Sequence, residues 1–430
     1  MRPEYEVIAT MRTFSFCLVL ITSAAATAAE PWPEFRGPTA DGHATSANLP
    51  VEWSESENVV WKTPIHGRGW SSPVIWGDRI WMTTATPEGH RLSAVCVDLK
   101  TGRVVHDFVV FEVAEPRDTK QFNSFASPTP VIEEGRAYLS WGSYGLVCLD
   151  SDSADVIWVR RDLECNHYRG PGSSPILHAG MLILHYDGYD YQYVVALDKE
   201  TGNTIWRTER PHDFETDNGD HKKAYGTPLV IETPDGTQQL ISPTSKGTFA
   251  YDPATGEELW RVRYKGFSTA CRPLYEHGLI FISSGFSRSE ILAVDPTGRG
   301  DVTDTHIRWI EKKSMPSKPS PLIVGDYLYT IDDRGVATCL EATTGEKVWQ
   351  TRVGGNFSAS PITAGGRLYL FSQTGKTTIL AARPEYEVLA ENHLDEGTMA
   401  SPAVAGNALI LRTDGHLYRI EDQQHAADGE

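Results

Sequence analysis

The sequence predicts an all-β fold, an eight-bladed β-propeller of four-stranded antiparallel blades whose ring is closed by an N-terminal strand. Three observations lead to this prediction. A proline followed by a short apolar run recurs eight times, and the pattern A-x-D-x-x-T-G-x-x-x-W recurs between these prolines. A segment near the N-terminus also resembles the outer strand that the last repeat lacks. Repeats of this length are typical of propeller blades.

The prolines define the period. In most copies the proline follows a small residue, and a proline at the first residue of a strand costs no ladder hydrogen bond. The eight prolines are Pro73, Pro128, Pro175, Pro228, Pro273, Pro321, Pro361 and Pro402. Pro73 and Pro402 are seven repeats apart, which gives an average period of 47 residues.

The sixth repeat shows how one blade is built. Its pattern predicts strands over 321–324, 327–331, 336–340 and 347–353. The Thr-Gly pair before the last strand supplies the positive φ that a tight turn needs, and the acidic residue before it can accept turn N–H groups. The tryptophan four residues after this glycine offers a flat side chain to pack between neighbouring blades. Complete copies of the pattern stand at 196–206 and 250–260.

The two ends of the chain complement each other. The eighth repeat stops after its third strand, predicted over 415–420, and no outer strand follows. Residues 59–63 (VVWKT) resemble residues 347–351 (KVWQT), which form the outer strand of the sixth repeat. We therefore expect the N-terminal segment to complete the last blade, because closing the ring removes open sheet edges.

The first residues read as a secretory signal. Arg12 precedes an apolar run at 14–21, and the small residues at 26–28 fit a cleavage site. We expect residues 1–29 to be an upstream extension and signal peptide, residues 30–421 a single propeller, and residues 422–430 a polar tail. This predicts a periplasmic or extracellular protein without a membrane span.

Five cysteines follow the signal segment, and an odd number makes a poor disulfide framework in an exported protein. Three of them share one repeat position, which suggests that they serve as small buried apolar side chains. The five are Cys96, Cys148, Cys165, Cys271 and Cys339.

Composition excludes several functions. The chain has 39 basic and 57 acidic residues, and its net charge of −18 argues against nucleic acid and anionic membrane surfaces as partners. The 37 glycines and 26 prolines leave little room for long helices.

The A-x-D-x-x-T-G-x-x-x-W pattern resembles the tryptophan-docking motif of pyrroloquinoline quinone (PQQ) repeats. Such repeats belong to the WD40-like/quinoprotein-like superfamily and build the propellers of quinoprotein alcohol dehydrogenases and of the outer-membrane protein assembly factor BamB. The resemblance covers residues 32–421. It implies the fold, whereas the motif residues join blades and do not contact cofactor.

The dehydrogenases of this superfamily usually carry an adjacent Cys-Cys disulfide and a Ca²⁺ site beside the quinone. The sequence has no adjacent cysteine pair, no recognisable calcium ligand set and no C-x-x-C-H haem motif. These features favour a propeller without dehydrogenase chemistry, with no cofactor expected, no catalytic residue assigned and no metal site assigned. PQQ with calcium stays open as an alternative.

A ligand site is predicted at one mouth of the central channel, because residues just before the inner strands face the axis of a propeller. Cations that converge in a concavity suit a carboxylated or phosphorylated ligand or an anionic sugar. The alternative is that these cations pair with acidic residues at the rim. The candidate residues are Trp70, Asn123, Arg169, Lys222, Tyr225, Arg272, Lys318 and Asn356.

Two further segments carry weaker hypotheses. The acidic loop 213–221 could hold Ca²⁺, although a solvated loop is the simpler interpretation. Asp187 and Asp190 could pair for acid/base chemistry, although D-G-Y-D more often forms a hairpin turn.

Three functions remain open at this point. The sequence favours a non-catalytic binding or scaffold protein of the cell envelope. We expect it to be a monomer that binds envelope proteins, or a small anionic or sugar ligand in the propeller channel. The alternatives are a PQQ-dependent oxidoreductase acting on alcohols or sugars, and a carbohydrate-binding or carbohydrate-active propeller.

Overall fold

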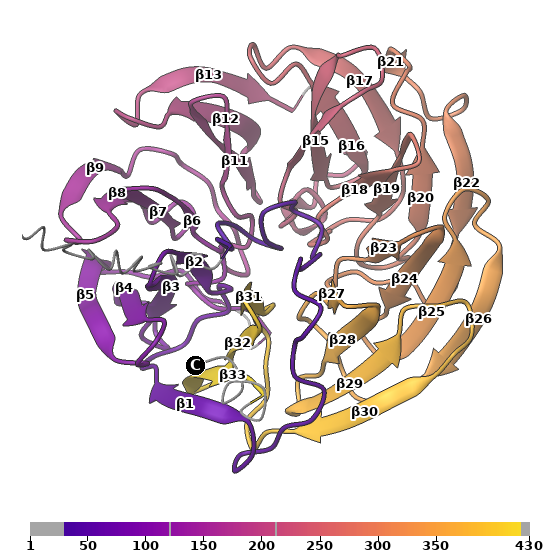
Figure 1. Ribbon diagram of the computed structural model, residues 1–430. Coiled ribbons are helices and arrows are strands. Elements are labelled where there is room, and N and C mark those ends of the chain that lie inside the picture. Colours follow the sequence, from indigo (N-terminus) through magenta and orange to yellow (C-terminus); the bar gives the residue numbers. More distant parts are fainter. Residues whose placement is uncertain (1–29, 120–121, 211–212, 423–430) are drawn as a thin grey trace, which may run out of the picture.

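The computed structural model describes residues 30–119, 122–210 and 213–422. The signal peptide predicted over 1–29 and most of the predicted polar tail lie outside the described residues. Eight antiparallel sheets surround a central axis, which confirms the eight-bladed propeller (Figure 1). Within the described parts of the chain, no helix has the length and apolar character needed to span a membrane.

Strands run outward from the axis in chain order within each blade. The first blade contains β2 (Val74–Trp76), β3 (Arg79–Ala85), β4 (Arg91–Asp98) and β5 (Val104–Glu112). The second contains β6 (Val131–Glu133), β7 (Arg136–Ser140), β8 (Leu146–Asp150) and β9 (Val156–Arg160). The third contains β10 (Ile176–His178), β11 (Met181–Asp187), β12 (Gln192–Asp198) and β13 (Thr204–Glu209). The fourth contains β14 (Leu229–Glu232), β15 (Gln238–Thr244), β16 (Gly247–Tyr251) and β17 (Glu258–Arg263).

The second half of the ring repeats this order. The fifth blade contains β18 (Leu274–Glu276), β19 (Leu279–Ser283), β20 (Ile291–Val294) and β22 (Ile307–Glu311). The sixth contains β23 (Leu322–Val324), β24 (Tyr327–Ile331), β25 (Val336–Glu341) and β26 (Lys347–Arg352). The seventh contains β27 (Ile362–Ala364), β28 (Arg367–Phe371), β29 (Lys376–Ala381) and β30 (Val388–His393). The eighth contains β31 (Ala403–Ala405), β32 (Ala408–Arg412) and β33 (His416–Ile420).

The N-terminal strand closes the ring as predicted. β1 (Val59–Pro64) pairs antiparallel with β33 and becomes the outer strand of the eighth blade. Residues from both ends of the described chain therefore share one sheet, so the blade forms only when the two ends meet.

Tryptophans of the repeat reach from one blade to the next. The indole N–H of Trp206 donates to the carbonyl of Pro253 at 3.0 Å. A Cβ placed on Gly256 would lie 2.6 Å from the same ring, so only glycine admits this approach. The same donation joins Trp61 to Leu99, Trp158 to Lys199 and Trp309 to Ala342.

Two blades use other residues for this contact. In the first blade His106 stands where the tryptophan would be, and its Nε2 lies 2.7 Å from the carbonyl oxygen of Asp152. In the fourth blade, Trp260 donates to Gln239, whose amide donates to the carbonyl of Pro296 in the next blade. In these two blades the contact with the next blade is therefore made by other side chains.

The structure corrects the prediction at two places. In the second blade Pro130, and not Pro128, directly precedes the inner strand β6, because the segment Ser127–Pro130 contains two prolines. The fourth sheet has a fifth strand, β21 (Gly300–Asp301), which pairs parallel with β17 opposite Trp260. This strand belongs to the insertion that separates β20 from β22.

The five cysteines among the described residues are buried and unpaired, as predicted. Burial raises the pKa of each thiol, so these side chains stay protonated in the interior.

Candidate functional site

A ring of hydroxyl groups surrounds the axis. Serine or threonine precedes the proline of the inner strand in seven of the eight blades. In six blades this hydroxyl accepts the backbone N–H of the corresponding residue in the preceding blade, at 2.8–3.2 Å. These six residues, which we call the hydroxyl ring, are Thr129, Ser174, Thr227, Ser320, Ser360 and Ser401. The bonds hold neighbouring inner strands together.

Arg272 occupies this position in the fifth blade and binds the N-terminal segment instead. Its buried guanidinium donates to the carbonyl of Phe35 at 2.6 Å and to that of Pro228 at 3.1 Å. It also lies 3.3 Å from a carboxylate oxygen of Glu34. Burial raises the pKa of Glu34, and the neighbouring charge of Arg272 offsets only part of this rise.

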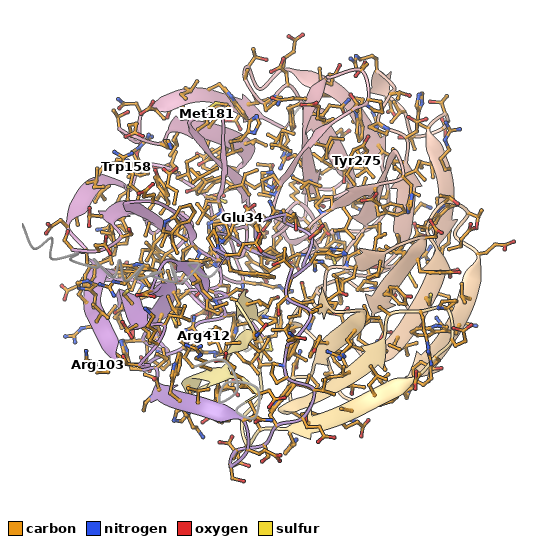
Figure 2. The ribbon with its side chains drawn as sticks, in the orientation of Figure 1. Glu34, Arg103, Trp158, Met181, Tyr275 and Arg412 are labelled. Atoms are coloured by element: carbon orange, nitrogen blue, oxygen red, sulfur yellow. The ribbon has the colours of Figure 1, made fainter. Side chains whose placement is uncertain are left out.

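The segment 32–44 crosses the ring, and we call it the crossing segment. Trp32 exchanges two backbone hydrogen bonds with β2, and Ala44 donates to β27 at 2.9 Å. Between these ends, the buried guanidinium of Arg36 donates to the carbonyls of Ser320 and Pro321, just before β23. Figure 1 shows the segment in indigo across the centre of the ring, and Figure 2 labels Glu34 there.

A central cavity of about 1060 Å³ lies within the ring. Phe35 of the crossing segment contributes to its wall, together with every member of the hydroxyl ring except Ser320. Phe122 and Phe286 also line it, and they are 52% and 60% exposed, so they mark its outer rim. The cavity therefore extends from the crossing segment towards solvent.

The structure brings five of the eight candidate residues together around this cavity. They are Trp70, Asn123, Arg169, Tyr225 and Lys318. Lys222, Arg272 and Asn356 do not line it. Lys222 follows the 3-10 turn η1 (Gly219–His221), and the next residue, Lys223, faces the cavity in its place.

Asn123 has a structural role within the wall. Its side-chain amide donates to the carbonyls of Arg169 and Pro171 at 3.0 and 3.1 Å. Its carbonyl oxygen accepts the hydroxyl of Ser127 at 2.6 Å and the N–H of Ser124 at 2.8 Å. This amide is therefore committed to loops of the second and third blades.

Most cavity cations have acidic neighbours. Arg169 lies 2.9 Å and Lys223 lies 2.7 Å from the carboxylate of Asp220, and Lys318 lies 3.4 Å from that of Asp333. Burial would raise the pKa of Asp220, but hydrogen bonds from Lys223 and Arg169 outweigh it and lower the pKa. The interpretation that rim acids neutralise these cations thus holds for these three.

Sequence reasoning missed several cavity residues. Lys312, Lys223 and Arg334 add positive charge, and Phe267 and Phe286 add aromatic surface. None occupies a repeat position that can be read from the period. Lys223, Lys312 and Phe267 lie in loops that precede inner strands, as the predicted candidates do, whereas Arg334 and Phe286 lie in connections within the sixth and fifth blades.

The two weaker hypotheses receive no support as reaction centres. Asp187 forms a buried ion pair with Arg210 at 2.7 Å, away from the cavity lining. Across residues 30–422, apart from the four that are not described, no group of three His, Cys, Asp or Glu residues is arranged to hold a metal ion. The cavity residues thus offer no carboxylate cage of the kind that Ca²⁺ takes.

These features define the class as a closed eight-bladed propeller with a central cavity lined by hydroxyl, charged and aromatic side chains. The family model described as "Outer membrane protein assembly factor BamB" matches residues 40–208, 114–298 and 250–421. The chain belongs to this family.

Individual relatives are distant. Outer membrane protein assembly factor BamB of Shewanella oneidensis is 23% identical over 320 residues, covering 68% of this chain and 73% of that protein. A 1-butanol dehydrogenase (quinone) of Thauera butanivorans is 37% identical over 78 residues, but these cover only 16% of this chain and 11% of that enzyme.

Solved structures show the same fold at low identity. BamB from Moraxella catarrhalis superposes with a TM-score of 0.61 at 15% identity, covering 85% of this chain and 98% of that chain. Quinohemoprotein alcohol dehydrogenase from Comamonas testosteroni superposes with a TM-score of 0.61 at 12% identity. The match covers 91% of this chain and 80% of that enzyme. The fold is thus shared by an outer membrane protein assembly factor and by alcohol dehydrogenases, so it does not decide the activity.

Proposed function

We propose that this chain is a non-catalytic binding protein of the cell envelope that takes part in the assembly of outer-membrane proteins. The observation that carries the proposal is the match to the BamB family along nearly the whole propeller. The rigid ring presents loops from eight blades, which is a surface suited to protein partners. The signal-like segment before residue 30 supports export to the periplasm or the extracellular space.

The test is a disruption of the gene in the organism that carries it. Outer-membrane β-barrel proteins are then quantified in the envelope by mass spectrometry, with abundant periplasmic proteins as the internal reference. We expect the barrel proteins to fall at least twofold and to recover when the intact gene is restored. Unchanged barrel levels, or recovery of this chain in the cytoplasmic fraction, would contradict the proposal.

A quinone-dependent oxidoreductase is the second candidate, favoured by the 78-residue match to 1-butanol dehydrogenase (quinone). The cavity could receive a flat acid, but its described residues offer no Ca²⁺ cage. The purified protein is titrated with PQQ in the presence and absence of Ca²⁺, and tryptophan fluorescence and melting temperature are followed. Saturable micromolar binding with dye-linked oxidation of alcohols would establish this candidate, and its absence would remove it.

A further inference from the structure

Exposed basic side chains gather on one face of the ring, over the fourth, fifth and sixth blades, which are consecutive sectors of it (Figure 1). Strands within a blade alternate in direction, so the connection that leads into each inner strand and the turn between the second and third strands open on the same face. We call this group the basic arc. Its members are Lys265, Arg288, Lys312, Lys313, Arg334 and Arg352.

Contacts between neighbouring loops make the arc continuous. Phe267 and Phe286 meet edge-on with their centroids 5.6 Å apart, which joins the loop of Lys265 to the turn of Arg288.

The arc continues over the sixth blade. The amine of Lys312 lies 3.6 Å from the carboxylate of Glu290, which follows the same turn of the fifth blade. The guanidinium of Arg352, at the end of β26, donates to the carbonyl of Arg334 at 2.9 Å. The six cations therefore belong to one surface that spans three blades.

The charge of this surface is not balanced by acids. The loops that carry the arc contain three acidic residues, Glu290, Asp332 and Asp333, and all three are half-buried. Among the described residues, Lys312 is the only member of the arc that pairs with an acidic side chain. On a chain with a net charge of −18, this patch attracts an acidic partner.

An exposed aromatic ring stands within the arc. Phe286 is 60% exposed, which is more than any other large apolar side chain among the described residues. It lies in the same turn as Arg288, and its contact with Phe267 holds it in place. Covering such a ring removes apolar surface from water, so the partner carries an apolar side chain as well as acidic groups.

This combination fits an acidic polypeptide segment better than a membrane. A flat bilayer would bring the whole face close to its anionic headgroups, including the exposed Asp213, Glu215, Asp217 and Asp414. A narrow peptide contacts the arc alone, and charges farther away than the Debye length of about 8 Å at physiological salt are screened. The three guanidinium groups of the arc also match the planar geometry of carboxylates.

From these observations we infer that the basic arc docks an acidic segment of a partner protein, whose carboxylates pair with the cations and whose apolar side chain packs on Phe286. Lys265, Arg288, Lys313 and Arg352 lie outside the lining of the central cavity, so the segment binds along the rim and need not enter the cavity. The inference concerns the purified chain, and its failure would leave the assembly proposal, which is tested in cells, untouched.

The experiment is fluorescence anisotropy with short labelled peptides. The acidic probe is built from Glu and Gly with one central Phe, and the matched neutral probe carries Gln at every Glu position. We expect saturable binding of the acidic probe, at least about tenfold tighter than that of the neutral probe and weakened about tenfold when salt rises from about 50 to about 300 mM. Failure to saturate at millimolar concentration, or equal binding of the neutral probe, would overturn the inference.

Two further anions test the class of partner. Phosphatidylglycerol vesicles represent a membrane, and polygalacturonate represents an anionic polysaccharide. Each competes with the acidic probe at an equal concentration of negative charge. We expect both to displace the probe less effectively than the unlabelled acidic peptide does, because neither offers an apolar side chain beside its charges. More effective displacement by either one would show that the partner is not a polypeptide.

Charge reversal tests the assigned cations. The triple variant Lys265→Glu/Arg288→Glu/Lys313→Glu changes exposed residues without a described acidic partner, so its melting temperature should stay within a few degrees. Its affinity for the acidic probe should fall at least about tenfold. The matched control makes the same change at three exposed arginines outside the arc, Arg91, Arg103 and Arg299. If the triple variant and this control bind the probe equally well, the arc is not the docking site.

Removing the aromatic ring tests the apolar contact. Phe286→Ser should weaken binding of the acidic probe about threefold to tenfold, with its salt dependence unchanged, because the cations stay in place. A probe with Gly in place of its Phe should bind this variant and the unmodified protein equally. If Phe286→Ser leaves the affinity for the acidic probe unchanged, the ring has no part in docking.

Discussion

Replacing Arg272 with serine tests how the crossing segment is held. The substitution supplies the hydroxyl that the other inner strands carry at this position, so the ring itself should be preserved. It removes the guanidinium that donates to the carbonyl of Phe35 at 2.6 Å and lies 3.3 Å from Glu34. Glu34 is then left without its cation, and its pKa rises further. Hydrogen bonds from a charged group contribute about 1.5–3 kcal/mol each, so opening of the segment should become about 3–5 kcal/mol easier.

Hydrogen exchange measures this opening directly. The amides of Trp32 and Ala44 donate to the ring from the two ends of the crossing segment, both at 2.9 Å. Their protection should fall by a factor of about one hundred to a few thousand, while amides of β33 keep theirs. Arg103→Ser is the control, since this arginine is exposed at the outer margin of the first blade (Figure 2). A fall of less than threefold would refute the anchoring role of Arg272.

Three further predictions concern the stability of the blades. Asp187→Asn leaves the buried charge of Arg210 unpaired and should lower the free energy of unfolding, measured in urea, by about 3–5 kcal/mol. The double variant Asp187→Leu/Arg210→Met should recover most of this loss. A loss below about 1 kcal/mol in the single variant would contradict the prediction. Burial lowers the pKa of His167 to about 4, below its unfolded value near 6.5, so the unfolded chain binds the proton more tightly. Stability should therefore fall as the pH drops from about 6.5 to 4, by up to about 3 kcal/mol, and the fall should be smaller in His167→Gln when melting is followed across this range. Trp206→Ala removes the indole that packs on Gly256, and it should cost about 3–5 kcal/mol in the same urea assay; no change would show that this contact is dispensable.

The fold could be predicted because its determinants are local and repeated. Every blade has a proline before its inner strand, and the first six have an acidic residue before their last turn, in a period of about the same length. The closing strand β1 could be found because it repeats an outer-strand pattern. The departures fall where the repeat is ambiguous or interrupted. Pro128 and Pro130 both fit the pattern, and β21 lies in an insertion that no other blade contains.

The site was only partly predictable, because it depends on contacts that no period describes. Ring geometry places Arg169 and Lys318 in the cavity wall. The turn η1 shifted the facing lysine from Lys222 to Lys223, since one residue of difference turns a side chain to another face. Arg272 turned to the crossing segment, and its bond to Phe35 joins residues that are 237 positions apart. Such a contact leaves no mark in the local pattern.

The charged side chains of the cavity are distributed unevenly around the axis, because they stand at positions that differ from blade to blade. The hydroxyl ring is nearly symmetric about the axis, but the cations are not. All five cations of the lining belong to one side of the ring. Arg169 precedes the third blade, Lys223 the fourth, and Lys312 and Lys318 the sixth, while Arg334 lies in a turn within the sixth. The opposite wall is formed by the first, seventh and eighth blades and contributes Trp70, Met399 and uncharged hydroxyls. The acids of the lining, Asp220, Asp332 and Asp333, lie on the same side as the cations, so the charged groups of the cavity gather opposite Trp70.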